Sequence, residues 1–136
     1  MKIYFGGSIR GGRGDQEIYL EIINILKNYG EVLTEHIGDK SVTDMGQIYR
    51  TDEEIFNKDV SWVHDCDVMV SEVTNPSLGV GYELGLAESL NKKIIALYRP
   101  SEDRKLSSMI RGNKNITCID YKDISELSII FDRILK

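Results

Sequence analysis

The 136-residue sequence is poor in the residues that mark specialised classes of protein. It has two cysteines and two prolines, and no apolar run reaches the ~18 residues of a membrane-spanning helix. Two cysteines cannot form a framework of disulfides, so Cys66 and Cys118 are expected to be buried free thiols. Because Met1 and Lys2 lead directly into an apolar, strand-like run, we expect no signal peptide, no membrane association and a cytoplasmic location.

Positive charge is also scarce. The chain has 17 Lys and Arg against 22 Asp and Glu, which gives a formal net charge of -5. Duplex binding depends on a basic face that neutralises several phosphates, so we expect no nucleic-acid partner. An anionic ligand would have to be bound by local features.

The length of the chain and its composition, which is that of an ordinary globular protein, predict one domain over residues 1–136.

What the sequence does contain is a strict alternation of strand and helix patterns. Apolar runs rich in β-branched residues predict strands at 2–5, 31–34, 68–73, 93–98 and 116–119. Helical spacing predicts a first helix over about 15–29, capped by Gly30, and a second that starts at a capping box of Thr51 and Glu54. Three more helices are predicted over about 81–90, near 106–110 and from about 123. Apolar strands in this order predict an α/β fold: a doubly wound, five-stranded parallel sheet in a Rossmann/flavodoxin-like three-layer sandwich.

In such a sheet, ligands bind beyond the carboxyl ends of the strands where the strand order reverses, usually between the first and third strands. The first strand is followed by Gly6 to Gly14, a segment with five glycines, a serine and two arginines. Its backbone amides and the helix start that follows predict a phosphate site, although a flexible turn with solvated arginines has a similar composition. The candidate residues are Gly7, Ser8, Ile9, Arg10, Gly11, Gly12 and Arg13.

The segment after the third strand faces the same switch point. Ser77 offers a hydroxyl, Gly79 permits close approach of a ligand, and Glu83 is predicted to lie in the first turn of the next helix. A carboxylate there can also be a surface residue that complements the helix dipole. The location opposite the glycine-rich segment favours a functional role.

Asp59 is a second candidate, because it falls in the apolar arc of the helix that starts at Thr51. A carboxylate there needs a partner or a function, since an unpaired buried charge costs several kcal/mol. His36, at the carboxyl end of the second strand, could reach the same cleft or be structural. The pair His64 and Cys66 has no second ligand pair at metal-site spacing, so no metal is expected.

Two carboxylates beside a phosphate site predict glycosidic chemistry on a nucleotide, in which one carboxylate attacks or stabilises the anomeric carbon and the other transfers protons. This chemistry needs no cofactor. The sequence does not identify the base.

Several strings together carry a family resemblance: GSIRGGR at 7–13, DVSW at 59–62, SLGVGYELG at 77–85 and LSSMIRG at 106–112. The chain resembles the Rcl-type 2'-deoxynucleoside 5'-phosphate N-hydrolases of the nucleoside 2-deoxyribosyltransferase superfamily. The resemblance implies that Glu83 is the nucleophile of a retaining mechanism with a glycosyl-enzyme intermediate, that Asp59 is the second acid and that Tyr4 orients the nucleophile.

The same resemblance implies a deoxyribonucleoside 5'-monophosphate substrate, with Ser8, Arg10, Ser77 and Gly79 in the phosphate site. It also implies a homodimer in which Ser107 reaches the phosphate bound by the partner subunit. Two alternatives stay open within the superfamily: transfer of deoxyribose to a second base, and hydrolysis of a pyrimidine ribonucleotide. A non-catalytic nucleotide-sensing module is the alternative from another class.

Overall fold

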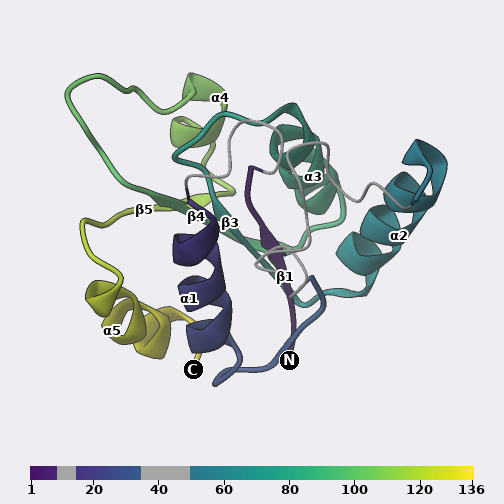
Figure 1. Cartoon of the computed structure of the whole chain (residues 1–136), viewed down its shortest axis with the longest axis horizontal. Coiled ribbons are helices and arrows are strands. Elements are labelled where there is room, and N and C mark those ends of the chain that lie inside the picture. The colour runs from purple at the N-terminus through teal and green to yellow at the C-terminus, as the bar shows by residue number, and fades with distance from the viewer. Residues whose placement is uncertain (9–14, 35–49) are drawn as a thin grey trace.

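The computed structural model describes residues 1–8, 15–34 and 50–136 (Figure 1). The strands form a parallel sheet in the order β2-β1-β3-β4-β5, so β1 and β3 are neighbours and the strand order reverses between them. The predicted doubly wound sheet is therefore confirmed. In chain order the elements are β1 (Lys2–Gly6), α1 (Gln16–Leu26), β2 (Glu31–Val32), α2 (Asp52–Asp65), β3 (Val68–Glu72), α3 (Leu78–Ser89), β4 (Lys93–Tyr98), α4 (Ser108–Arg111), β5 (Thr117–Asp120) and α5 (Ser125–Ile134).

Each face of the sheet has its own hydrophobic core. Ile3 and Phe5 of β1 pack with α1 and α5, whereas Tyr4, between them, packs with α2 and α3. This division follows from the period of two along a strand, which points successive side chains to opposite faces. Figure 1 shows α1 beside α5, with α2 and α3 grouped away from them. Tyr4 is therefore directed towards the helices that carry Asp59 and Glu83.

Strand β2 is shorter than the predicted run at 31–34. Its ladder with β1 ends after Val32, and Thr34 contacts β1 through its side chain instead. Thr34 Oγ1 accepts a hydrogen bond from Phe5 N at 2.7 Å and donates one to Phe5 O at 2.6 Å. Because this hydroxyl satisfies both backbone groups of Phe5, the strand pairing is not needed at that position.

The start of α2 agrees with the sequence, whereas the end of α1 does not. The predicted capping box at Thr51 is present: Thr51 Oγ1 accepts from Glu54 N at 3.1 Å, and Glu54 Oε1 accepts from Thr51 N at 3.2 Å. The prediction that Gly30 caps α1 is wrong, because that helix ends at Leu26. Gly30 instead passes close to the first residue, and a Cβ on it would lie 2.2 Å from Met1 O.

The short helix α4 starts two residues later than predicted, because Ser107 is its N-cap and accepts from Met109 N at 3.2 Å. Cys66 is a buried free thiol as predicted, whereas Cys118 is free but only half-buried. Within the described ranges, no helix has the length and apolar character needed to cross a membrane.

Candidate active site

Tyr4 and Glu83 form the centre of the candidate site. Tyr4 is 1% exposed on β1, and its hydroxyl donates a hydrogen bond of 2.5 Å to Glu83 Oε2 on α3. Burial and the negative charges of Glu83 and Asp59 raise the pKa of Tyr4 far above its usual value. The phenol is therefore a permanent donor, and it fixes one oxygen of the Glu83 carboxylate.

Glu83 does not lie where the sequence predicted. Helix α3 begins at Leu78 rather than near Gly81, because Ser77 Oγ caps it by accepting from Val80 N at 3.2 Å. Glu83 is therefore in the second turn, where the helix dipole contributes little. Its side chain faces the sheet next to the residues that α3 buries there, so the interpretation as a dipole-complementing surface residue does not apply.

Burial dominates the acidity of Glu83. It raises the carboxyl pKa to about 7, with a further rise from the charge of Asp59 and an opposing effect of the hydrogen bond from Tyr4. Burial likewise raises the pKa of Asp59 to about 6, against the lowering effect of Lys58 and Arg50. At neutral pH the pair is thus poised to hold one proton, and such coupled groups supply an acid and a base together.

Asp59 lies on α2, half-buried, four positions before the buried Val63. Its charge acts on both Glu83 and Tyr4, so the structure brings the three predicted catalytic residues to one end of the α2–α3 face. Tyr82 and Phe56 flank this region, with ring centroids 6.2 Å apart and more than half of each side chain exposed. An exposed aromatic pair thus joins the two helices that carry the acids.

The backbone of β1 closely approaches Glu83. A Cβ on Gly6 would lie 3.4 Å from Glu83 Oε1 and 3.1 Å from Ser71 Oγ. Ser71 is fully buried, and its hydroxyl has no hydrogen-bond partner in the described part of the chain. Glycine at position 6 thus leaves room for the Ser71 hydroxyl beside the Glu83 carboxylate, a role that sequence reasoning did not assign.

The predicted phosphate residues are only partly within the described ranges. Ile9, Arg10, Gly11, Gly12, Arg13 and His36 lie outside them. Gly7 packs on the Tyr19 ring, where a Cβ would meet ring atoms at 3.0 Å, and the Ser8 amide donates to Tyr19 Oη at 3.1 Å. Ser8 is fully buried.

Ser77 and Gly79 occupy the start of α3. The first amides of a helix have no partner within it and favour an anion. Among the described residues, the nearest atom to a Cβ on Gly79 would be Ser77 Oγ at 3.8 Å. A cavity of about 420 Å³ adjoins this helix start, and Ser107 contributes to its wall together with Ser77. The two serines therefore face one space within the same chain.

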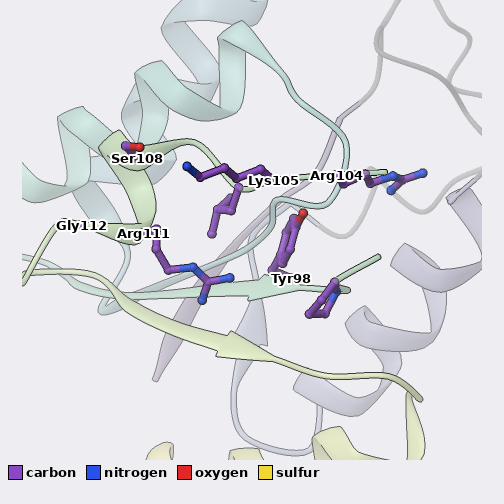
Figure 2. A pocket seen from close by; sticks show the side chains of 8 residues that line it. Tyr98, Arg104, Lys105, Ser108, Arg111 and Gly112 are labelled. Atoms are coloured by element: carbon purple, nitrogen blue, oxygen red, sulfur yellow. The ribbon is translucent and has the colours of Figure 1, made fainter. Parts of the chain in front are cut away.

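A second cavity, of about 360 Å³, shares Tyr98, Lys105 and Leu106 with the first (Figure 2). The guanidinium of Arg111 lies 5.5 Å from the centre of the Tyr98 ring and forms an ion pair with Asp120 at 2.9 Å. Arg104 and Lys105 also line this space, but within the described ranges no carboxylate does. It lacks the acid and base that glycosidic chemistry needs.

Sequence reasoning missed a buried polar cluster at the carboxyl ends of β3 and β4. Glu72 is fully buried and accepts hydrogen bonds from Thr74, Arg99 and Tyr121. Arg99 also pairs with Asp15, at the start of α1. The sequence signal was a glutamate inside the otherwise apolar run at 68–73, which an unpaired carboxylate would destabilise.

Comparisons with known proteins identify the family of the chain. The sequence matches the profile of a family described as nucleoside 2-deoxyribosyltransferase over residues 3–121. The 5-hydroxymethyl-dUMP N-hydrolase of Danio rerio is 49% identical over 126 residues, which cover 93% of this chain and 88% of that protein. The Rattus norvegicus protein of the same name is 51% identical over 135 residues, covering 96% and 82%.

A solved structure, that of the CMP N-glycosidase of Clostridium botulinum, superposes with a TM-score of 0.70. The alignment covers 99% of this chain and 100% of that one at 21% identity. At this level of identity the likeness concerns the fold.

Proposed function

This chain belongs to the nucleoside 2-deoxyribosyltransferase family, and we propose that it hydrolyses the N-glycosidic bond of 2'-deoxyribonucleoside 5'-monophosphates to free base and 2-deoxyribose 5-phosphate. The observation that carries the proposal is the Tyr4 hydrogen bond to a half-buried Glu83 whose pKa is raised to about 7 by burial and by Asp59. The relatives named N-hydrolases support the broader class, a hydrolase acting on N-glycosidic bonds. Their names make 5-hydroxymethyl-dUMP the first substrate to test.

In the proposed mechanism, Glu83 attacks C1' of the sugar as a carboxylate. Because the pKa of Glu83 is the higher of the two, the reacting form is the minor one, in which the shared proton has moved to Asp59. The bond from C1' to the base breaks, and Asp59 transfers that proton to the departing base. The result is an ester between Glu83 and the sugar, as in retaining glycosidases. Tyr4 keeps the attacking carboxylate in position by its hydrogen bond to Oε2, which also favours the ionised form.

The second half of the reaction uses the same residues in reverse roles. Asp59, now ionised, removes a proton from water, the water oxygen attacks C1', and Glu83 leaves as a carboxylate. One water molecule is consumed, and the sugar is released with its original configuration. A 2'-deoxyribose suits this route, because it lacks the 2'-hydroxyl that withdraws electrons from an oxocarbenium-like transition state.

The 5'-phosphate provides binding energy away from the reacting carbon. We assign it to the start of α3, with Ser77 and the amide of Gly79, and to the glycine-rich segment with Arg10. We further propose a homodimer in which Ser107 reaches the phosphate bound by the partner subunit. The exposure of Leu78 (98%) and Met109 (81%) beside the cavity lined by Ser107 supports a covered surface there.

A base-release assay tests the reaction. We expect free base from 5-hydroxymethyl-dUMP or another deoxynucleoside monophosphate among dGMP and dCMP, and little from GMP or deoxyguanosine. Glu83→Gln should abolish release while the nucleotide still binds, and Glu88→Gln, the same change on the same helix, should not. Turnover of deoxyguanosine without turnover of any monophosphate would contradict the proposal, as would phosphate-dependent binding without any cleavage.

The intermediate is tested separately. Mixing enzyme with excess substrate and quenching with acid should give a burst of free base and a protein mass increased by one deoxyribose phosphate, absent in Glu83→Gln. Release of base without burst or adduct, together with an inverted product in methanol, would contradict the retaining route. Addition of a second free base tests transfer, which we expect to be slower than hydrolysis.

A further inference from the structure

The buried cluster around Glu72 plays no part in the proposed chemistry, yet it joins the starts of two helices. Glu72, the last residue of β3, is 0% exposed. Its Oε1 accepts from Thr74 N at 2.7 Å, and its Oε2 accepts from Thr74 Oγ1 at 3.0 Å, Arg99 Nε at 3.1 Å and Tyr121 Oη at 2.5 Å. Four donors on one carboxylate make Glu72 a fixed anchor for Arg99.

Arg99 carries this anchorage to the first helix. One nitrogen of its guanidinium contacts Glu72 and another pairs with Asp15, while its own backbone amide donates to Thr74 Oγ1 at 3.0 Å. The side chains of Arg99 and Asp15 are only 24% and 14% exposed. The planar guanidinium suits such a link, because it offers several donors in a rigid arrangement.

Asp15 is at the N-cap of α1 but does not cap it. An aspartate at this position ordinarily accepts from the first amides of its own helix, whereas here no side-chain capping bond forms. Its Oδ2 accepts instead from Arg99 and from Asn75 Nδ2, the latter at 2.8 Å. The first amides of α1 are thus left without the side chain that normally satisfies them.

Asn75 belongs to the turn that leads into α3. It lies two positions before Ser77, the N-cap of that helix. The hydrogen bond from Asn75 to Asp15 therefore fixes the N-terminus of α1 relative to that of α3 across the switch point of the sheet. Two helix N-termini held together in this way form a strong environment for a phosphate dianion.

We propose that Arg99 is a positioning residue that, through Asp15 and Asn75, holds the starts of α1 and α3 at the spacing that binds the substrate's 5'-phosphate. Arg99 does not touch the reacting carbon. It binds Asp15, and Asp15 in turn binds Asn75. The proposal rests on the proposed function, because it names what sets the affinity of that same site for a phosphorylated substrate.

Two variants test the link. Arg99→Lys keeps the charge but replaces the rigid guanidinium by a single ammonium, and Asp15→Asn removes the charge that Arg99 binds. We expect each to raise KM for the deoxynucleoside monophosphate about tenfold, with kcat changed less than about threefold. Inhibition by inorganic phosphate should weaken by the same factor. Asp65→Asn is the matched control, since Asp65 pairs with Lys2 at the other end of the sheet.

A purely structural cluster predicts a different pattern. In that case the variants would lower the melting temperature and kcat while leaving KM and phosphate inhibition unchanged, and this result would overturn the proposal. Should Arg99→Lys fail to fold, Asp15→Asn decides the question alone. Calorimetric titration of the unmodified and variant proteins with inorganic phosphate needs no turnover. The change in phosphate affinity therefore tests the role of Arg99 even if the proposed hydrolysis proves wrong.

Discussion

Tyr4 and Glu83 are joined by a hydrogen bond of 2.5 Å across 79 positions of sequence, from a strand in the middle of the sheet to the second turn of α3. The bond lowers the pKa of Glu83, against burial and the charge of Asp59, which raise it to about 7. The contact therefore partly offsets the larger effect of burial on the acidity of Glu83.

Replacing Tyr4 by Phe should therefore change both rate and pH dependence. Loss of the hydrogen bond removes a lowering effect, so the pKa of Glu83 should rise above about 7 and the acidic limb of kcat/KM should move to higher pH. We expect kcat to fall about 10- to 100-fold. The pH profile of base release is the measurement, and an unmoved acidic limb would argue that Glu83 is not the ionised nucleophile.

The raised pKa of Glu83 also predicts how stability depends on pH. Because the folded state holds the proton more tightly than the unfolded state, this group's contribution is complete below the unfolded pKa of about 4.5 and is lost as pH rises through about 7. Glu83→Gln removes this loss of stability at high pH, because glutamine does not ionise. The variant should exceed the parent in free energy of unfolding by on the order of 2 kcal/mol at pH 8 and by little at pH 5.

Urea denaturation at the two pH values measures this difference. Glu88→Gln is the matched control on the same helix, because its carboxyl accepts from Asn113 and Asn115 and its pKa is lowered in the fold. Its substitution should give no gain as pH rises. An equal gain in both variants would indicate a general charge effect rather than burial of Glu83.

Gly6→Ala should impair catalysis more than folding. The added Cβ would lie 3.1 Å from Ser71 Oγ, so this hydroxyl must shift by a few tenths of an ångström, and it would come into van der Waals contact with Glu83 Oε1 at 3.4 Å. We expect kcat to fall about tenfold, since small displacements of a nucleophile are costly. Adding Ser71→Ala, which removes the closer neighbour, should restore part of the activity, and no recovery would place the obstruction elsewhere.

Ser77→Ala separates capping from phosphate binding. Loss of the cap on α3 should cost about 1 kcal/mol of stability. Thr51→Ala removes the corresponding cap on α2 and should cost a similar amount. Only the Ser77 variant should also raise KM for the monophosphate, by about tenfold, because a hydrogen bond to a charged group is lost as well. Equal KM values in the two variants would remove Ser77 from the phosphate site.

The sequence predicted the sheet because its signals are local. Apolar strands that alternate with amphipathic helices admit few arrangements, and the capping box at Thr51 marked a helix start directly. Where the prediction failed, a contact from outside the segment decided the structure. Position 30 needs glycine because a Cβ there would collide with the carbonyl oxygen of Met1. Strand β2 ends early because the Thr34 hydroxyl forms hydrogen bonds with the backbone of Phe5.

The two acidic residues of the candidate site could be predicted from the sequence, but the residues that hold its elements in place could not. Glu83 and Asp59 were found from their places beside the switch point and on an apolar arc, and their partner Tyr4 only through the family resemblance. The link from Glu72 through Arg99 to Asp15 joins residues from three segments far apart in sequence. Such a network has no spacing rule, so only an acidic residue in a buried strand hinted at it.

The placement of Tyr4, Asp59 and Glu83 on three different elements has a consequence for how activity arises during folding. A fragment that lacks any part of residues 4–83 lacks one of the predicted catalytic residues or an element between them, and the phenol and its carboxylate meet only after β1 has paired with β3 and α3 has docked. Contacts so distant in sequence form late. Recovery of base release after dilution from denaturant should therefore coincide with the final folding phase, which makes the enzyme's own turnover a reporter of complete folding.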